Sequence, residues 1–452
     1  MKRRDFISTS IMGSIGISVA GSARPSGTFK GPNDKIVIAL IGAGDRGLGT
    51  IISTCRLNTG VEIKTICDVK TTRLETAGRS IEKELGYRPG TTKNMKEIFD
   101  DKDVNAVWIS TPEHWHALAT VWACQAGKDV YVEKNPTLSI SEGQKMVMAA
   151  GKYNRIVQIG FQNRSAPYGF SAREYIKSGM LGKIVQVKCY NLLGGKKWIR
   201  QPDQEVPDWI DWDAWLGPAP RRPFNSGITI PEGRGGWLDF WAFGGGALSD
   251  DASHVMDLAR MVLGDPPQPV SVYTCGGNRP WGSEKETPEF MSIIYDFKDF
   301  TLTCDSGIAT NYMKKTPEKI RMDPGLFPDW RTNATRTEIY GTEGLMYLGR
   351  HGGGWQVVGN DSAILAQEGG AFPDADHQVN FINSLRSREK PNGDVYQGHL
   401  SASLVHFGNI AYRAGNRHLL IDPEKERFTN DENANDLLST TYREHYAMPD
   451  NV

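Results

Sequence analysis

The sequence predicts an α/β protein with two domains: an N-terminal doubly wound parallel sheet, and a C-terminal α+β domain with a large, mainly antiparallel open sheet. Its 452 residues exceed what one hydrophobic core usually holds, since a domain takes about 150 residues. Within residues 35–160, apolar strands alternate with helical segments, which is typical of a parallel sheet covered on both faces. Beyond residue 180, strands follow one another without helices between them, which indicates antiparallel pairing.

The N-terminus is expected to lie outside both domains. Residues 1–23 have a basic start, a mildly apolar Ser/Gly-rich stretch and small residues at the end, which is the layout of an export signal. Arg3 and Arg4 resemble a twin-arginine signal, the type that exports folded proteins. The alternative is a basic N-terminus or an uncleaved anchor. We therefore expect a periplasmic protein, or a cytoplasmic one if this interpretation fails, with residues 24–34 as a linker.

Composition argues against several classes of partner. The 52 Lys and Arg residues balance 53 Asp and Glu residues, so the net charge of −1 gives no electrostatic reason for binding nucleic acid. No stretch of the mature chain reaches the roughly 18 consecutive apolar residues that span a bilayer. The six cysteines form no CxxC pair and no Cys/His cluster at zinc spacing, so no metal site is expected. A small ligand is the favoured partner.

A glycine-rich turn follows the first predicted strand, Ile36–Ile41. Gly42, Gly44 and Gly47 spell G-x-G-x-x-G between a strand and a helix. The first glycine permits a tight turn, the second lets backbone approach a pyrophosphate, and the third lets the helix pack on the strand. A purely structural turn is the alternative. The context favours a dinucleotide-binding Rossmann domain over residues 35–160.

Asp68 ends the second predicted strand, Val61–Cys67, 21 residues after Gly47. A carboxylate at about this distance bonds the adenosine ribose and repels the extra phosphate of NADP, so NAD is favoured over NADP. Arg46 is expected to compensate the charge of Asp45 inside the turn.

Further strand–helix units complete this domain. A strand over residues 104–110 is followed by Thr111, which we expect to cap a helix that ends before Gly127. Strands over residues 129–133 and 156–160 flank a helix over residues 141–153.

Glu133 and Lys134 end the strand over residues 129–133. In an open parallel sheet, ligands bind at the carboxyl ends of the strands, so both side chains are expected at the cofactor crevice. A solvated strand end is the alternative. The predicted cofactor contacts are Gly42, Gly44, Arg46, Gly47, Asp68, Thr111, Glu133 and Lys134.

Residues 161–452 form the predicted second domain. A helix is expected to end at Gly264 and to be capped by Ser249 or Asp250, with Asp250, His254 and Asp257 in a polar stripe. An imidazole flanked by carboxylates suits proton transfer near neutral pH, whereas a capping Asp and a core His are the alternative. Strands are expected over residues 183–190, 270–275, 290–297, 301–305 and 338–347, and late helices over 376–388 and 399–414.

Six tryptophans fall between residues 198 and 241. Aromatic rings suit the faces of a pyranose, although most of these rings are expected to pack in the structure. The candidate substrate contacts are Arg164, Trp237 and Asp257.

Three segments together resemble the Gfo/Idh/MocA family of oxidoreductases: GAGDRG at 42–47, EKN at 133–135 and GGGALSDDASHVMD at 244–257. The resemblance implies NAD, an open-sheet domain for substrate and oligomerisation, and a small sugar or glycoside as substrate. It implies catalytic roles for Lys134, Asp250 and His254: Lys134 polarises the reacting group, Asp250 orients it, and His254 takes the hydroxyl proton. Asn135 and Asp251 depart from the family's usual pattern.

The resemblance implies an NAD-dependent oxidoreductase that moves a hydride between a sugar ring carbon and tightly bound nicotinamide. An NAD-recycling glycosidase similar to the α-N-acetylgalactosaminidases of the same superfamily is an alternative. A noncatalytic sugar-binding protein is another. Because export would separate the enzyme from cytoplasmic NAD, the cofactor is expected to stay bound. A homo-oligomer is also expected.

Overall fold

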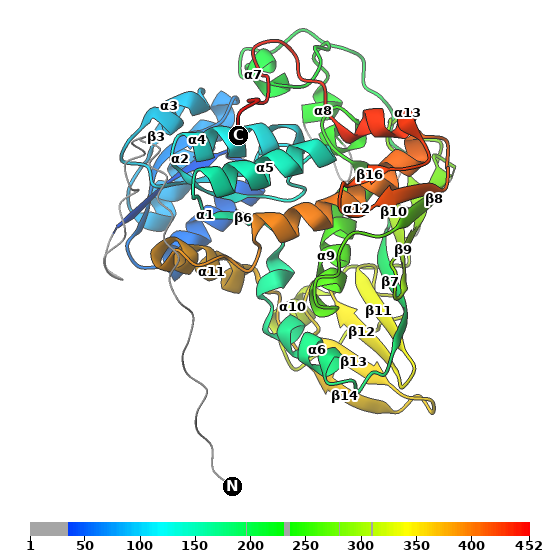
Figure 1. Cartoon of the computed structure of the whole chain (residues 1–452). Coiled ribbons are helices and arrows are strands. Elements are labelled where there is room, and N and C mark those ends of the chain that lie inside the picture. Colours follow the sequence, from blue (N-terminus) through cyan, green and yellow to red (C-terminus); the bar gives the residue numbers. More distant parts are fainter. Residues whose placement is uncertain (1–34, 196, 230–235, 280, 309–310) are drawn as a thin grey trace, which may run out of the picture.

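The computed structural model describes residues 35–195, 197–229, 236–279, 281–308 and 311–452. The predicted signal and linker lie outside the described residues. Figure 1 shows an N-terminal lobe and, beside it, a second lobe built around a large sheet.

The first lobe contains a six-stranded parallel sheet of order β3-β2-β1-β4-β5-β6, which confirms the predicted doubly wound arrangement. The three-residue strand β3 was not expected, since no apolar run marks it. The strands are β1 (Ile36–Ile41), β2 (Val61–Cys67), β3 (Gly90–Thr92), β4 (Ala106–Ile109), β5 (Asp129–Val132) and β6 (Val157–Ile159).

Helices connect these strands along the chain. They are α1 (Asp45–Leu57), α2 (Thr71–Leu85), α3 (Met95–Asp100), α4 (His116–Gln125) and α5 (Ile140–Lys152). The predicted cap at Thr111 is wrong. The 3-10 turn η1 (Glu113–Trp115) precedes α4 and has Pro112 at its N-cap without a side-chain bond, because the Thr111 side chain lies at a cavity.

The second sheet has ten strands in the order β14-β13-β12-β11-β7-β10-β9-β8-β15-β16. Only β7 and β10 pair in parallel among its described strands, so the prediction of a mainly antiparallel sheet is confirmed. Its strands are β7 (Ile184–Leu193), β8 (Ser271–Gly277), β9 (Phe290–Asp296), β10 (Thr301–Ile308), β11 (Arg336–Gly341), β12 (Leu345–Gly349), β13 (Trp355–Val358), β14 (Ile364–Glu368), β15 (Leu419–Asp422) and β16 (Arg427–Phe428).

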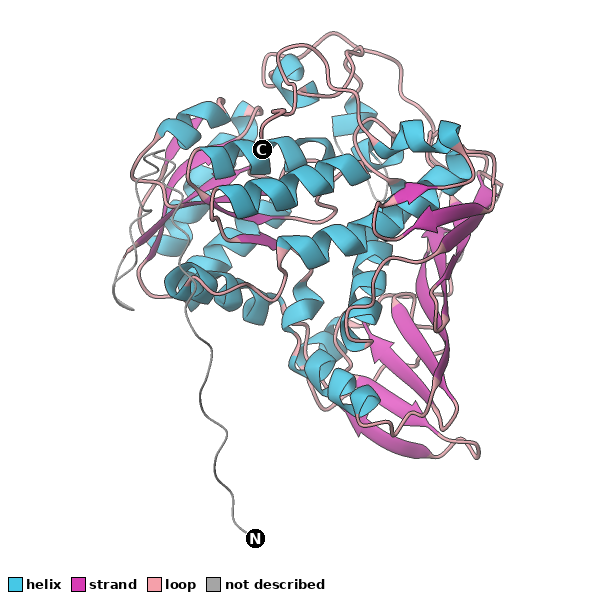
Figure 2. Cartoon of the chain, viewed as in Figure 1, coloured by secondary structure: helices cyan, strands magenta, loops and turns pink. Residues whose placement is uncertain are grey.

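Helices cover one face of this sheet, as Figure 2 shows. They are α6 (Pro167–Lys177), α9 (Ser253–Val262) and α12 (Val395–Arg413). Their apolar side chains share one core with the inward-facing residues of the strands. Outward-facing residues such as Tyr273 and Ile294 stay exposed.

One late helix crosses to the other lobe. α11 (Asp374–Ser387) packs on the parallel sheet, where Phe381, Ile382 and Leu385 join the core that contains Trp108. The parallel-sheet lobe is therefore completed by residues that lie far beyond position 160 in the sequence.

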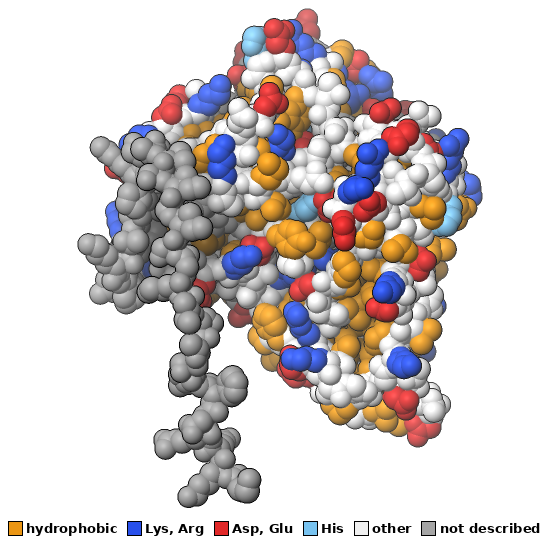
Figure 3. All heavy atoms as spheres, in the orientation of Figure 1, with side chains coloured by type: hydrophobic (Ala, Val, Ile, Leu, Met, Phe, Trp, Pro, Cys, Tyr) orange, Lys and Arg blue, Asp and Glu red, His pale blue; other side chains and the backbone are white. Residues whose placement is uncertain are grey.

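Short elements make up the remaining connections: η2 (Gln162–Ser165), α7 (Trp212–Leu216), α8 (Ser226–Thr229), η3 (Gly236–Asp239), η4 (Leu248–Ala252), α10 (Glu318–Met322), α13 (Glu432–Asn435) and η5 (Asp436–Leu438). Within the described residues, no helix has the length and apolar character needed to cross a membrane. Figure 3 shows charged side chains of both signs interspersed over the visible face.

Several buried histidines make the fold sensitive to acid. Burial lowers the pKa of His116, His351 and His377 to about 4 and that of His114 and His406 to about 3. Below the ordinary histidine pKa of about 6.5, the unfolded chain binds protons that the folded chain does not, so the free energy of unfolding falls as pH falls. We expect the urea midpoint to drop from pH 6.5 towards pH 4.

Replacing one of these histidines tests the cause. The variant His406→Gln should reduce the slope of unfolding free energy against pH by up to about 1.4 kcal/mol per pH unit. His418→Gln, at an exposed position, is the matched control and should keep the wild-type slope. Equal slopes for all three proteins would contradict the assignment.

Candidate active site

The glycine turn after β1 has the close packing that its sequence predicts. Gly42 adopts a φ of +91°, and a Cβ there would lie 2.6 Å from the Ser110 backbone. A Cβ on Gly47 would lie 2.4 Å from the Gly42 carbonyl oxygen. The three heavy atoms nearest to a Cβ on Gly44 would all belong to the Arg73 side chain, the nearest at 3.4 Å. Backbone can therefore approach a ligand at Gly44, while Asp45 is exposed.

Asp68 ties the end of β2 to this turn. Its Oδ2 accepts a hydrogen bond from the Ala43 backbone N–H at 2.8 Å, and its Oδ1 accepts one from the Lys70 backbone N–H at 2.9 Å. Arg73 Nη1 lies 3.9 Å from Asp68 Oδ2. A carboxylate has about four lone-pair sites, so these bonds leave capacity for ribose hydroxyls.

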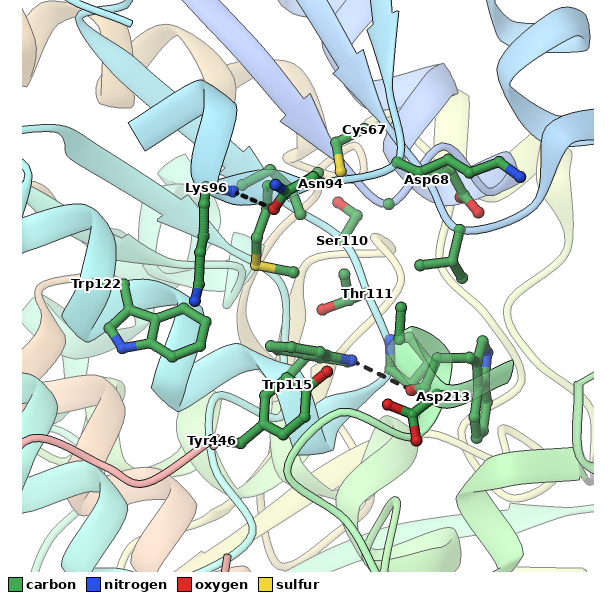
Figure 4. Close-up of a pocket in the computed structure, with 18 of the residues that line it drawn as sticks. Cys67, Asp68, Asn94, Lys96, Ser110, Thr111, Trp115, Trp122, Asp213 and Tyr446 are labelled. Atoms are coloured by element: carbon green, nitrogen blue, oxygen red, sulfur yellow. Dashed lines mark hydrogen bonds between the residues drawn. The ribbon is translucent and has the colours of Figure 1, made fainter. Parts of the chain in front are cut away.

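A cavity of about 380 Å³ opens beside Asp68. Figure 4 shows Asp68, Ser110 and Thr111 on its walls together with Trp115 and Tyr446. Its volume is within the range of small-molecule sites, which is about 300–1,000 Å³. Together with the open approach at Gly44, it fits the adenosine part of a dinucleotide.

Segments from outside the parallel sheet cover this cavity. Asp213 and Trp215 of α7 line it, and so do His445 and Tyr446 of the C-terminal segment, defined here as residues 439–452. Arg443 joins the two segments, because its Nη1 donates to Asp213 Oδ1 at 2.5 Å and its Nη2 donates to the Asp213 carbonyl at 2.6 Å.

Anchors on both sides hold this cover. The Tyr442 hydroxyl donates to Glu142 on α5 at 2.7 Å, and Val452 is buried in the core of the parallel-sheet lobe. The Tyr446 ring packs edge-on against Trp115 at a centroid distance of 5.5 Å. Sequence reasoning missed this role of the C-terminal segment, since no motif marks it.

Arg46 and Glu133 meet at the other end of the crevice. Arg46 Nε donates to Glu133 Oε1 at 2.8 Å, and its two Nη atoms donate to the carboxylate of Asp374 at 2.9 Å each. The structure therefore pairs Arg46 with these carboxylates and records no bond to Asp45 among the described residues. The predicted compensation of Asp45 is not what this geometry shows.

Lys134 and Asp250 join the two lobes. Lys134, just beyond β5, donates from Nζ to Asp250 Oδ1 at 2.8 Å. Burial acts to lower the pKa of Lys134, but the charges of Asp250 and Asp251 raise it above its ordinary value. Lys134 therefore stays a cation over the physiological range.

The predicted helix cap at Ser249 or Asp250 is wrong. α9 is preceded by the π-helical turn η4, and neither helix has a side-chain cap. Asp250 has a ψ of −125°, which interrupts the helical backbone. Its side chain bonds Lys134 instead of a backbone N–H at the helix start.

His254 lies in the first turn of α9, 3% exposed. Its ring packs edge-on against Phe161 at 5.6 Å, and its Nδ1 has no hydrogen-bond partner among the described residues. Burial lowers the pKa of His254 well below 6.5, and the charges of Arg350 and Lys134 lower it further. The imidazole is thus neutral near pH 7 and able to accept a proton.

A second group of charged residues near His254 escaped sequence reasoning. Asp251 forms an ion pair with Lys315, and its Oδ1 lies 3.4 Å from Nε2 of His351. Burial on its own would raise the pKa of Asp251, but His351, Lys315 and Arg350 hold it well below its ordinary value. These partners follow β10 and β12, about 65 to 100 positions further along the chain, so no local motif marks them.

Glu113 adds a buried carboxyl group near Lys134. Its Oε2 accepts a hydrogen bond from the Gly245 backbone N–H at 3.2 Å. Burial raises the pKa of Glu113 to about 8, although the charge of Lys134 opposes the shift. This carboxyl group is therefore largely protonated at neutral pH.

The three candidate substrate contacts lie in different settings. Arg164 Nε donates to Asp257 Oδ1 at 2.7 Å, and Arg164 also pairs with Asp265 at 3.0 Å. Since Arg164 and Asp257 are both buried and bonded to each other, we now assign them to the support of α9. Trp237 lies in η3 and packs against an aromatic cluster around α7. Its contact with substrate stays a prediction.

Two family models match the chain. One, described as an oxidoreductase family with an NAD-binding Rossmann fold (GFO_IDH_MocA), matches residues 36–161. The other, described as the C-terminal alpha/beta domain of that oxidoreductase family, matches residues 171–305 and 342–448.

Individual relatives match over shorter lengths. Levoglucosan dehydrogenase from Pseudarthrobacter phenanthrenivorans is 28% identical over 175 residues, which cover 39% of this chain and 37% of the relative. A glycosyl hydrolase family 109 protein from Shewanella pealeana is 28% identical over 231 residues, covering 46% of this chain and 50% of the relative. The chain thus aligns with half or less of each of these two proteins.

Solved structures share the fold. The WlbA dehydrogenase of Bordetella pertussis, solved with NADH and UDP-GlcNAcA, superposes with a TM-score of 0.61 at 18% identity, covering 86% of this chain and 99% of that one.

Replacing Asp68 tests its part in cofactor choice. Asp68→Asn keeps a carbonyl acceptor for the turn but removes the negative charge. The affinity for NADP relative to that for NAD should therefore rise by about tenfold or more, which corresponds to about 1.4 kcal/mol. Asp68→Ala should also weaken NAD, because both backbone bonds of the carboxylate are lost.

Titrations of both cofactors against the three proteins give the measurement. Asp103→Asn, at an exposed position, is the control and should bind like wild type. An unchanged preference in Asp68→Asn would remove Asp68 from the binding site.

Proposed function

This chain belongs to the Gfo/Idh/MocA oxidoreductase family, and from that premise we propose that it oxidises a hydroxyl group of a sugar or glycoside with NAD as its cofactor. The observation that carries the proposal is the 2.8 Å bond from Lys134 to Asp250. It places the carboxyl edge of the parallel sheet, where NAD binds in such folds, against the helix that holds His254.

Bound NAD supplies the two-electron acceptor for a carbinol carbon. Gly42, Gly44 and Asp68 would hold its adenosine and phosphates, and Glu133 and Lys134 flank the opposite end of the crevice. Lys134 remains a cation and donates hydrogen bonds, so it stabilises negative charge that develops on the reacting oxygen.

His254 takes the proton from the sugar hydroxyl in this proposal. Its depressed pKa keeps the imidazole neutral, and its Nδ1 has no hydrogen-bond partner among the described residues. Asp250 holds Lys134 in place, and the protonated Glu113 adds no competing negative charge beside it. General-base catalysis of this kind contributes about 10²–10⁴-fold.

The glycosidase alternative is favoured by the family 109 relatives. Such an enzyme would release an aglycone while NAD is regenerated within one cycle. Incubation with aryl glycosides, with free aglycone and NADH both followed, distinguishes the two. NADH formation with sugars supports the dehydrogenase, whereas aglycone release without net reduction contradicts it.

We also propose that NAD stays bound and that the protein acts after export. The cavity walls support retention, because Trp215 and Tyr446 form part of them and Arg443 ties α7 to the C-terminal segment. If NAD is to stay bound for hours away from the cytoplasmic pool, it must dissociate at about 10⁻⁴ s⁻¹. At an association rate of about 10⁶ M⁻¹s⁻¹, this corresponds to a Kd of about 10⁻¹⁰ M.

We also propose that the protein forms a homo-oligomer through the helix-free face of the ten-stranded sheet. Exposed Tyr273 and Ile294 on this face support it, since apolar side chains on a broad sheet favour burial against another surface.

Removing the imidazole tests the catalytic assignment. His254→Ala should lower kcat by about 10²-fold or more while bound NAD is retained, because His254 acts on the substrate proton. In the wild type, the acid limb of kcat/KM should lie below pH 6.5, since the pKa of His254 is lowered. His418→Ala, at an exposed site, should keep wild-type turnover. Normal turnover in His254→Ala, or loss of NAD, would refute the assignment.

Opening the cover tests cofactor retention. Arg443→Gln and Tyr446→Ala should each speed NAD dissociation by about tenfold or more, which corresponds to a loss of about 1.4 kcal/mol. The measurement is NAD(H) released from desalted protein over time. Arg427→Gln, which alters an exposed ion pair with Glu432, is the control. A wild-type protein that purifies without NAD and binds it only at micromolar levels would contradict retention.

A further inference from the structure

Arg350 carries a buried guanidinium group that has no carboxylate partner among the described residues. It lies just beyond β12, where it is 3% exposed. Its Nη2 donates to Gln162 Oε1 at 3.5 Å, and its guanidinium carbon lies 5.0 Å from the centre of the Phe372 ring. Nε and Nη1 have no acceptor among the described residues. Three N–H groups are therefore left without a partner.

Such a group is costly to bury. An uncompensated charge inside a protein costs several kcal/mol, so buried arginines are normally paired. The carboxylates nearby are already engaged: Asp251 pairs with Lys315 and His351, and Asp374 binds Arg46 through both oxygens. The described residues therefore supply no acceptor to Nε and Nη1 of Arg350.

Contacts within the described residues connect the Arg350 guanidinium group to the surroundings of His254. Its partner Gln162 directly follows Phe161, whose ring packs against His254. The charge of Arg350 is also among the causes that lower the pKa of His254. A ligand that reaches His254 thus comes near Arg350.

The backbone around Arg350 is fixed before any ligand binds. Its N–H donates to the Thr335 carbonyl at 3.2 Å, and its carbonyl accepts a bond from Asn163 Nδ2 at 3.0 Å. Gly352 and Gly353 follow with φ values of +79° and +83°, which only glycine adopts readily. A group held in this way is positioned for recognition with little ordering cost.

We propose that Arg350 binds a carboxylate on the sugar, which makes uronic acids or their glycosides the substrate class of this enzyme. This inference rests on the proposed function. A planar guanidinium matches the planar carboxylate in its hydrogen-bond geometry. One unpartnered cation suits a monoanion better than a phosphate dianion, which usually collects several donors. Lys134 and Lys315 each pair with a carboxylate of the chain, Asp250 and Asp251, whereas Arg350 pairs with none among the described residues.

Calorimetric titration of the NAD-loaded enzyme with matched sugars tests this. The pairs are D-glucuronate with D-glucose and D-galacturonate with D-galactose, with D-glucose 6-phosphate as the dianionic probe. We expect at least one uronate to bind about tenfold tighter than its neutral partner or more, and Arg350→Met to abolish that preference while NAD content is unchanged. Arg350→Lys should retain part of the uronate preference, and this variant becomes the test if Arg350→Met does not fold. Arg331→Met, at an exposed arginine, should behave like wild type.

The outcomes separate the two proposals. Equal affinity for acidic and neutral sugars, or an uronate preference that survives in Arg350→Met, overturns the carboxylate site, and NADH formation then shows whether the dehydrogenase stands. Absence of uronate binding to folded NAD-loaded enzyme also overturns it, as does tighter binding of glucose 6-phosphate. Binding of an uronate that depends on Arg350 without NADH formation supports the site but contradicts oxidation of that sugar.

Discussion

The ion pair between Lys134 and Asp250 is the contact on which the arrangement of the site depends. Lys134 comes from the parallel sheet and Asp250 from the start of the helical region over the open sheet. The pair is partly buried, with side-chain exposures of 19% for Lys134 and 31% for Asp250, so separating its members would leave a partly desolvated charge without its partner. It therefore fixes how the edge that would hold NAD faces the helix with His254. The distorted backbone at Asp250 is consistent with this: the carboxylate reaches across to Lys134 instead of capping its own helix.

The positions of the candidate residues in the fold could be predicted where they depend on local chain geometry. The glycine turn, Asp68 and Lys134 each follow a short apolar strand, and parallel strands deliver their carboxyl ends to one edge. The strand and the residue after it therefore suffice to place them. His254 lies four positions after Asp250, and it stands in the first turn of α9 although the backbone at Asp250 departs from the helix. Errors occurred at helix starts: Thr111 and Asp250 have the chemistry of caps, but tertiary partners and a cavity wall determine where their side chains lie.

The rest of the site depends on contacts between distant segments, and here the sequence carries no local signal. Arg350 lies on a turn after β12, almost 100 residues beyond His254, and an arginine beside glycines is typical of any exposed turn. Only the fold shows that this one is buried. Tyr446 and Arg443 lie in a segment without periodicity, yet they cover the cavity beside Asp68. α11 likewise completes the first lobe from position 374 onwards, although strand–helix alternation ends near residue 160.

The side chains at the two ends of the crevice differ in chemical type. At the adenosine end, aromatic rings and the cover formed by α7 and the C-terminal segment surround the cavity, and Arg443 holds the two covering segments together. At the catalytic end, charged groups dominate, and their partners come from turns of the open sheet. In the proposed enzyme, a sugar that enters beside His254 would meet Arg350 and Lys134, whose described contacts do not include Tyr446 or Arg443. Exchange of substrate therefore does not require the cover over the adenosine to open. An enzyme with this division can turn over many sugars on one bound cofactor, provided that a second substrate returns the cofactor to its starting oxidation state.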